Sequence, residues 1–174
     1  QHALAAVLAH PAPLVLDADA LNLVAAHPAL QKSLAARTGA SILTPHPAEA
    51  ARLLATSTDS IQHDRIAAAR ALSTRFNAGV VLKGNGSVCA LKNGDWYVNT
   101  SGNPGMAAAG MGDVLSGIVA SLTAQGGDPG LALLAGVHLH GLAADQLVAE
   151  GTGPAGLTAS EVTDAARRLL NKAR

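Results

Sequence analysis

The segment PLVLDADALNLVAAH at positions 13–27 sets the pattern that the rest of this chain repeats. Its first residues form an apolar run without polar alternation, which is typical of a strand buried on both faces, and the remainder has helical periodicity. The same order recurs in SILTPHPAEAARLL at 41–54, and a third apolar run, GVVLKG, follows at 79–84. Buried strands that alternate with helices predict an α/β layered domain with a mostly parallel central sheet.

The segments on either side of the third run extend this prediction. We expect one long helix that is capped by Asp59 or Ser60 and ends at Phe76, because apolar residues recur along one stripe. After the run, SVCALK and DWYV flank the pair Asn93-Gly94. This pair is a strong hairpin turn signal, so we expect an antiparallel hairpin near an edge of the sheet.

From Ala107 onward the chain is expected to be helical. The first of three helices ends at Gly126-Gly127, the second begins at Asp128-Pro129, and the third opens with a capping box of Thr158 and Glu161. No linker, repeat or low-complexity tract divides the sequence, so we expect residues 1–174 to form a single domain.

Composition narrows the class of protein. Hydrophobic residues make up 49% of the chain, which disfavours intrinsic disorder, and 12 basic residues balance 12 acidic ones, which disfavours nucleic acid or an anionic membrane as partner. Cys89 is the single cysteine and has no partner for an internal disulfide, so a reducing, cytoplasmic location is expected. We see no apolar run of membrane-spanning length and expect a soluble protein.

The most informative stretch is NTSGNPGMAAAGMGDVLSGIVASLTAQG at 99–126, where glycines precede a helix. Backbone N–H groups that no side chain obstructs can converge on an anion, and a helix N-terminus adds partial positive charge. We therefore expect the N–H groups of Gly110, Met111 and Gly112 to form an anion hole. Asp113, which follows them, is a candidate base for a hydroxyl that attacks phosphorus, and a simple helix cap is the alternative.

Three further segments carry weaker signals. KGNGS at 83–87 offers glycines, a lysine and a hydroxyl after a strand, but it lacks the full dinucleotide-binding fingerprint, so an ordinary turn remains open. His46 lies between two prolines at the end of a strand, where ligands collect in α/β sheets. Asp17 and Asp19 could hold a cation near phosphates, or Asp19 could cap a helix.

The remaining candidates are less informative. His138 and His140 are two residues apart on an expected helix, so they face different directions and are interpreted as packing or surface residues. Cys89 has no partner motif for a nucleophile. Trp96 and Tyr97 could flank an adenine or could simply pack at a sheet edge.

Four motifs, in this order and spacing, resemble the dehydratase domain of the NAD(P)H-hydrate repair enzymes. They are LDADALN (16–22), LTPHPAEAARLL (43–54), VVLKGNGS (80–87) and GNPGMAAAGMGDVLSGIVASLTAQG (102–126). The likeness runs along essentially the whole chain, and the last motif is long, which makes it specific. The resemblance implies a ribokinase-like fold and the ADP-dependent (in eukaryotes ATP-dependent) dehydration of the S epimer of hydrated NADH or NADPH.

The resemblance also implies roles for particular positions. His46 matches the family's hydrate-contacting histidine, and Gly112 and Asp113 match positions that contact the nucleotide and the hydrate. The nucleotide-binding segment of the family corresponds to Lys83, Gly84, Asn85, Gly86 and Ser87. Mg²⁺ would bridge the phosphates of ADP or ATP, no metal ligand is expected from the protein, and the family generally forms homo-oligomers, with a tetramer as one candidate.

The chain also departs from the family pattern. Many members have Thr or Ser where this chain has Met111, and Gly where it has Ala48. Members carry further sequence before the position of Gln1, including a glycine-rich loop that helps to hold the hydrate, so we expect a truncated copy or part of a longer chain. Fusion to, or cooperation with, an NAD(P)H-hydrate epimerase is expected. A small-molecule kinase of the same fold and a non-catalytic nucleotide-binding module are the alternatives.

Overall fold

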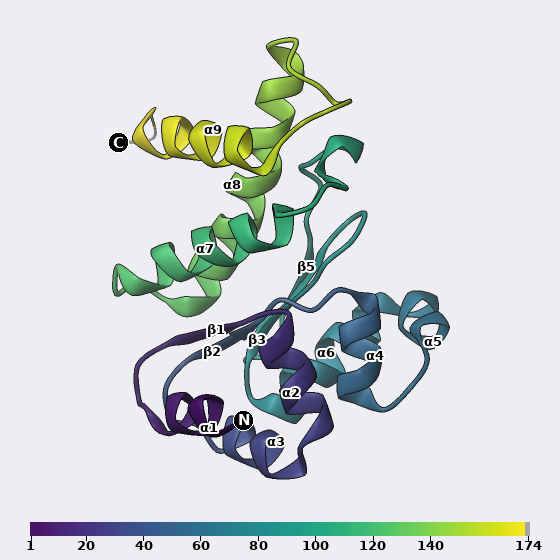
Figure 1. The fold of residues 1–174 in the computed structure, drawn as a ribbon, viewed down its shortest axis with the longest axis vertical. Coiled ribbons are helices and arrows are strands. Elements are labelled where there is room, and N and C mark those ends of the chain that lie inside the picture. The colour runs from purple at the N-terminus through teal and green to yellow at the C-terminus, as the bar shows by residue number, and fades with distance from the viewer. Residues whose placement is uncertain (173–174) are drawn as a thin grey trace.

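Three parallel strands and an antiparallel hairpin form one sheet in the computed structural model, which describes residues 1–172 (Figure 1). The order is β1-β2-β3-β4-β5; β1, β2 and β3 run parallel, and the pairs β3-β4 and β4-β5 are antiparallel. The strands are β1 (Leu14–Leu16), β2 (Ser41–Leu43), β3 (Gly79–Leu82), β4 (Val88–Ala90) and β5 (Trp96–Val98). The predicted α/β class, the three parallel strands and the edge hairpin are confirmed.

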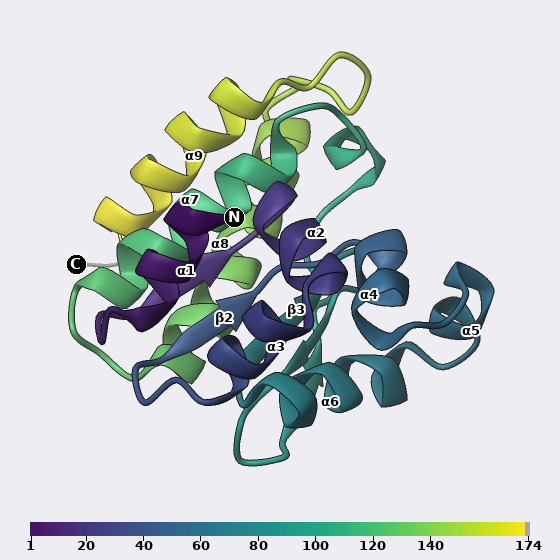
Figure 2. The ribbon, with the colours of Figure 1, turned by 60° about the horizontal axis from the view of Figure 1, so that its bottom comes forward.

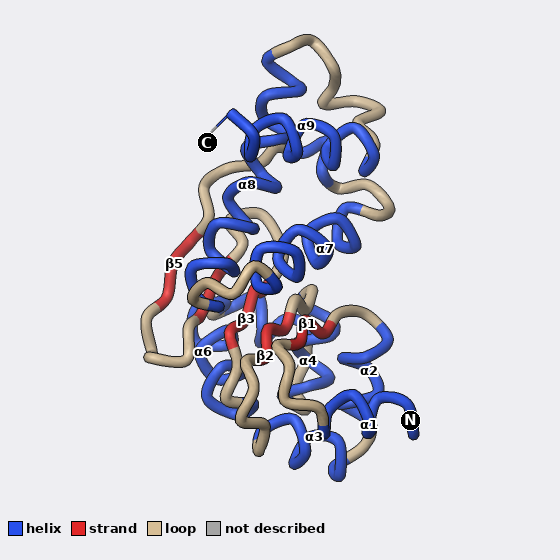
Figure 3. Tube along the Cα trace, turned by 90° about the vertical axis from the view of Figure 1, so that its left-hand side faces the viewer, coloured by secondary structure: helices blue, strands red, loops and turns tan. Residues whose placement is uncertain are grey.

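Helices cover both faces of this sheet (Figures 2 and 3). The helices before and between the parallel strands lie on one face, and those of the C-terminal part lie on the other. The first group is α1 (His2–Ala9), α2 (Asp19–Ala26), α3 (Pro28–Ala35), α4 (Pro47–Leu54), α5 (Thr58–His63) and α6 (Arg65–Phe76). The second group is α7 (Met111–Ala124), α8 (Pro129–Ala149) and α9 (Ala159–Lys172), with the 3-10 turn η1 (Pro104–Met106) before it.

Successive residues of the strands enter different cores, because side chains alternate between the two faces of a sheet. In β3, Val80 and Leu82 belong to the core under α2 to α6, whereas Val81 belongs to the core under α7 and α8. In β4, Val88 and Cys89 divide in the same way. The apolar runs lack polar alternation because both of their faces are covered.

The expected long helix that ends at Phe76 is two helices, and this prediction was wrong. Ser57 caps α5, where its side chain accepts a hydrogen bond from the Ser60 N–H at 3.1 Å. Asp64 then ends α5 and caps α6, where its carboxylate accepts from the Ala67 N–H at 2.9 Å. The side-chain cap at Asp64 starts a new helix in the middle of a stripe that looked continuous. Helix α3 was not anticipated.

Helix α8 is the central element of the C-terminal part. It has 21 residues, and its most apolar window reaches a mean hydropathy of 1.3, so by length and composition alone it could cross a membrane, which differs from the expectation from sequence. Half of that window is buried inside the protein, where α8 contacts α7, α9 and β3. Core helices of globular proteins have the same properties, and α8 packs as one of them.

Two leucines of α8 test how the sheet and this helix are held together. Leu133 is fully buried in the core with Ile42 and Val81, whereas 67% of Leu131 is exposed. We expect Leu133→Ala to lower the free energy of unfolding by about 2–5 kcal/mol, because it leaves a cavity. Leu131→Ala should change it by less than about 0.5 kcal/mol. Urea denaturation measures both; equal effects would contradict this packing.

Candidate functional site

The carboxyl ends of the three parallel strands carry polar side chains that meet at one edge of the sheet. Asp17 follows β1, Thr44 follows β2 and Lys83 follows β3. The Lys83 Nζ lies 2.8 Å from Asp17 Oδ1, and Ser116 of α7 donates a hydrogen bond to Asp17 Oδ2 at 2.6 Å. The Ser116 hydroxyl is also 3.3 Å from the Thr44 hydroxyl. These contacts attach α7 to the sheet edge.

The ionised form of Asp17 is the favoured one at this position. Burial raises the pKa of the Asp17 carboxyl, but the hydrogen bonds from Lys83 and Ser116 and the charge of Lys83 outweigh burial, so the pKa lies below its ordinary value. A carboxylate that already accepts from an ammonium and a hydroxyl has little capacity left for a cation. The structure therefore favours an ion-pair role for Asp17 over the cation-binding alternative.

Helix α7 begins directly beside this ion pair. Gly110, the N-cap, has a φ of 82°, a left-handed conformation that favours glycine. Two residues further on, a Cβ on Gly112 would lie 3.3 Å from the Lys83 Nζ. The absence of a side chain at Gly112 therefore allows Lys83 to approach the start of α7. Within residues 1–172 the N–H groups of Gly112 and Asp113 find no acceptor. Free N–H groups at a helix N-terminus attract anions.

The segment Lys83–Ser87 forms a tight loop between β3 and β4. The Ser87 hydroxyl accepts from the Gly84 N–H at 3.3 Å and donates to the Gly84 carbonyl at 3.1 Å. Arg65, the first residue of α6, reaches the loop from outside and donates to the carbonyls of Leu82, at 3.1 Å, and Asn85. The loop is therefore held in one shape from within and from α6.

A second loop, residues 99–103, rests on α8. The Asp145 carboxylate accepts from the Gly102 N–H at 2.7 Å and from the Asn103 side-chain amide at 3.0 Å. A Cβ on Gly141 would collide with Ser101, so this glycine allows the loop to approach the helix. Helix α8 thereby sets the position of the loop.

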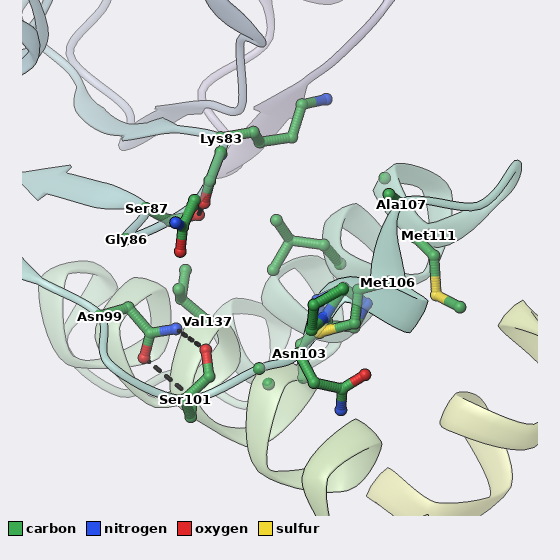
Figure 4. Close-up of a pocket in the computed structure, with 18 residues that line it drawn as sticks. Lys83, Gly86, Ser87, Asn99, Ser101, Asn103, Met106, Ala107, Met111 and Val137 are labelled. Carbon is green, nitrogen blue, oxygen red and sulfur yellow. Dashed lines mark hydrogen bonds between the residues drawn. The ribbon is translucent and has the colours of Figure 1, made fainter. Parts of the chain in front are cut away.

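These segments enclose a pocket of about 540 Å³ (Figure 4). In Figure 4, Lys83, Gly86 and Ser87 lie on one side, and Asn99, Ser101 and Val137 lie on the other. The side near Lys83 offers backbone N–H groups and polar side chains, whereas apolar side chains contribute much of the rest. The lining residues are Lys83, Gly84, Asn85, Gly86, Ser87, Asn99, Ser101, Gly102, Asn103, Pro104, Met106, Ala107, Met111, Gly112, Leu115, Val137, His140 and Gly141.

One of the lining residues is a buried histidine without a hydrogen-bond partner. His140 of α8 is 7% exposed, and its buried Nε2 has no partner within the described residues. Burial lowers the pKa of its imidazole to about 4, so the ring is neutral at pH 7. Most buried polar side-chain atoms in proteins are hydrogen-bonded, and an exception is a candidate for a ligand contact.

The structure brings together most of the residues predicted from sequence. Lys83, Gly84, Asn85, Gly86 and Ser87 line the same pocket as Met111 and Gly112, although the two segments are separated by the hairpin. Gly110 and Asp113 flank these last two residues but are not part of the lining. Asp113 lies exposed in the first turn of α7.

His46 lies outside this pocket and caps α4. The His46 Nδ1 accepts a hydrogen bond from the Ala48 N–H at 3.1 Å. The backbone N–H of His46 donates to the Glu49 carboxylate at 2.8 Å. The ring Nε2 is 3.3 Å from the same carboxylate, and 47% of the His46 side chain is exposed. The ring therefore has a defined orientation at the carboxyl end of β2, with one face open to solvent.

Reasoning from sequence missed the contribution of α8 and of Ser116. His140 was interpreted as a packing or surface residue, and Asp145 and Gly141 were not considered. A glycine in the interior of an expected helix is the signal that could have identified Gly141, because such a glycine often marks a close approach. Ser116 offers no local signal, because its partner Asp17 is 99 positions away.

Three weaker candidates, Cys89, Trp96 and Tyr97, lie outside the pocket. Cys89 is buried in β4, and burial raises the pKa of its thiol to about 12, so it is a poor nucleophile. Trp96 and Tyr97 are each more than two-fifths exposed on the edge strand β5, and neither lines the pocket.

The described residues contain no group of three or more His, Cys, Asp or Glu side chains that could hold a metal ion. A magnesium ion in a nucleotide site is commonly bound by phosphate oxygens, water and one or two carboxylates instead of a protein cage. The donor set of this pocket therefore fits an ion that enters with a nucleotide, and it does not fit a resident metal centre.

Comparisons with known proteins show the family to which this chain belongs. The sequence profile of a family described as NAD(P)H-hydrate dehydratase matches residues 1–168. A relative from Neisseria meningitidis, named ADP-dependent (S)-NAD(P)H-hydrate dehydratase, is 50% identical over 160 residues, which are 92% of this chain and 54% of the relative. A bifunctional NAD(P)H-hydrate repair enzyme from Escherichia coli is 42% identical over 159 residues, which are 91% of this chain and 29% of that enzyme.

A solved structure with a similar fold comes from the same family. An ADP/ATP-dependent NAD(P)H-hydrate dehydratase from Bacillus subtilis, co-crystallised with ATP and Mg²⁺ and soaked with CoA, superimposes with a TM-score of 0.81 at 31% identity. The match covers 97% of this chain and 59% of that one. The fold is thus ribokinase-like as expected. The chain spans about half the length of the relative from Neisseria meningitidis and less than a third of the enzyme from Escherichia coli.

His140 predicts how stability depends on pH. The unfolded chain binds a proton at this histidine below about pH 6.5, whereas the folded state, with a pKa of about 4, does not. Lowering the pH from 6.5 towards 4 should therefore destabilise the protein through His140, by up to about 3 kcal/mol.

The variant His140→Leu should lose this component, so that its free energy of unfolding varies less with pH than that of wild type. His138→Leu, two residues away and exposed, is the control and should keep the wild-type dependence. Chemical denaturation at pH 4.5, 5.5, 6.5 and 7.5 measures the difference. Parallel curves for wild type and His140→Leu would contradict a buried, neutral imidazole.

Proposed function

Because the chain belongs to the NAD(P)H-hydrate dehydratase family, we propose that it takes part in the ADP-dependent dehydration of (6S)-hydrated NADH and NADPH, with release of AMP and phosphate. The observation that carries this proposal is the single pocket that joins the loop Lys83–Ser87 to the glycine-rich start of α7. Nicotinamide nucleotides damaged by hydration would regain their reduced, working form.

The polar side of the pocket is suited to the phosphates of ADP. The N–H groups of Gly112 and Asp113 at the start of α7 point to an anion site, and the helix dipole adds to it; the Met111 N–H, which we expected to take part, donates to the Ala108 carbonyl at 3.4 Å. The Lys83 ammonium lies within a few ångströms of Gly112, with Asp17 holding it in place. Preorganised donors of this kind stabilise the charge that develops on a transferring phosphoryl group.

Asp113 is the proposed base. It directly follows Gly112, which lines the pocket, and its exposed side chain belongs to the same first turn of α7. The ring hydroxyl of the hydrate would attack the β-phosphorus of ADP, its proton would pass to Asp113, and AMP would leave. His46, held at the next strand end by Glu49, is the proposed contact for the hydrate.

Phosphorylation turns a poor leaving group into a good one. The lone pair of the ring nitrogen would then expel phosphate from the neighbouring carbon, and loss of a proton from the adjacent ring carbon would restore the dihydronicotinamide. The chain's own contribution is to hold the phosphoryl group and the hydroxyl in line and to accept the first proton. Mg²⁺ would bridge the nucleotide phosphates, and ATP could replace ADP as donor.

We also propose that the protein forms homo-oligomers and that it acts with an epimerase activity, as the bifunctional relatives combine two activities in one chain. Leu142 of α8 is an exposed apolar side chain that an assembly could cover. Light scattering at micromolar concentration should report a mass above that of a monomer. A monomer over the whole concentration range would contradict the proposed assembly.

Replacement of Asp113 by Asn tests the proposed base. The variant should bind ADP with Mg²⁺ as wild type does, seen as the same rise in melting temperature, because Asn keeps the size of the side chain. Its rate of conversion of hydrated NADH should fall by about 10² to 10⁴, because the proton acceptor is lost. The return of absorbance of reduced nicotinamide follows the reaction.

Asp128→Asn is the matched control, because Asp128 caps α8 with an exposed carboxylate and does not line the pocket. It should retain wild-type turnover. If Asp113→Asn kept near wild-type turnover, Asp113 would not be the base, and the helix-cap alternative would hold. Absence of any thermal shift of the wild-type protein at millimolar ADP with Mg²⁺ would contradict the proposed function itself.

A further inference from the structure

His140 lies in the pocket with an unsatisfied hydrogen-bonding atom. His140 is more than nine-tenths buried, and its buried Nε2 forms no hydrogen bond within residues 1–172. A buried polar atom without a partner lowers the stability of the folded state, because it has lost its hydrogen bonds to water. An apolar residue of similar size would avoid this cost, so the imidazole needs a partner that the protein does not supply.

The position of His140 shows which part of a ligand could be that partner. Val137, His140 and Gly141 are spaced i, i+3 and i+4 on α8, so they share one face of the helix, and all three line the pocket. Figure 4 shows Val137 with Asn99 and Ser101, across the pocket from Lys83 and Ser87. The phosphate-binding elements are on the Lys83 side, so the face of α8 meets the other end of a bound nucleotide.

The surroundings of this face suit a nucleoside. Met106 and Val137 line the pocket with apolar atoms that can cover a flat base. A neutral imidazole offers one donor and one acceptor, which matches the ring nitrogens and the exocyclic groups of a base or the hydroxyls of a ribose. The loop 99–103 is held beside His140 by Gly141 and Asp145, so the geometry of this end is set before a ligand arrives.

We propose that His140 is a ligand-contacting residue that hydrogen-bonds the nucleoside part of the bound adenine nucleotide. This proposal rests on the proposed function, since it takes ADP as the ligand of the pocket. In this proposal, the buried imidazole of His140 lowers the stability of the free protein and increases its affinity for the nucleotide. A water molecule trapped beside Nε2 is the competing explanation, and it requires no change in affinity when His140 is replaced.

Calorimetric titration of three proteins tests this assignment. Wild type, His140→Leu and the control His138→Leu are each titrated with ADP and with pyrophosphate, both with MgCl₂. We expect His140→Leu to weaken ADP binding by roughly 3- to 12-fold, the loss of one hydrogen bond, and to leave pyrophosphate binding within twofold of wild type. His138→Leu, whose side chain is exposed, should leave both affinities unchanged.

A second readout does not depend on how well the variants fold. In wild-type protein labelled with ¹⁵N, the imidazole nitrogen resonances of His140 should shift on addition of ADP and not on addition of pyrophosphate. Equal ADP affinity of wild type and His140→Leu, or unchanged His140 resonances in saturated wild-type protein, would overturn the proposal. If wild type binds no ADP at all, the proposed function fails together with it, which is a distinct result.

Discussion

The ion pair between Asp17 and Lys83, with Ser116 as the third member, is the interaction on which the site depends. It joins the ends of β1 and β3 to α7 through one half-buried carboxylate. A carboxylate in this position must be compensated, and the Lys83 ammonium, the Ser116 hydroxyl and the Ala18 N–H compensate it. Because Ser116 belongs to α7, its hydrogen bond to Asp17 also fixes the position of α7 relative to the sheet. The N–H groups at the start of α7 therefore lie beside Lys83.

Helix α8 supports the opposite side of the pocket in a different way. Gly141 leaves room for the loop 99–103, and the Asp145 carboxylate accepts a hydrogen bond from it. The buried imidazole of His140 lines the pocket beside this loop. The first two features stabilise the loop, whereas the imidazole has no partner in the protein. Functional sites commonly retain such costs, because groups that bind a ligand cannot also be satisfied within the fold.

The match with the dehydratase family and the geometry of the pocket support each other. The residues that carry the likeness in sequence are distributed over strand ends and helix starts, and the fold brings the two glycine-rich segments to one cavity. The chain spans about half of the relative from Neisseria meningitidis, yet both walls of this cavity are formed within residues 83–141. The proposed nucleotide site therefore lies entirely within the part of the family that this chain spans.

The sequence by itself determined the strands, the hairpin and the glycine-rich helix start, because each depends on a local pattern: an uninterrupted apolar run, the pair Asn93-Gly94, and glycines before a helix. Tertiary structure decided the rest. The break between α5 and α6 lies at Asp64, where a capping side chain interrupts a continuous apolar stripe. The spacing of apolar residues does not show whether the cap or the stripe decides the helix boundary. Asp17 meets Lys83 and Ser116 across separations of 66 and 99 residues, and His140 enters the pocket only because α8 crosses beneath the loop. Such contacts are set by the packing of layers, which no local pattern encodes.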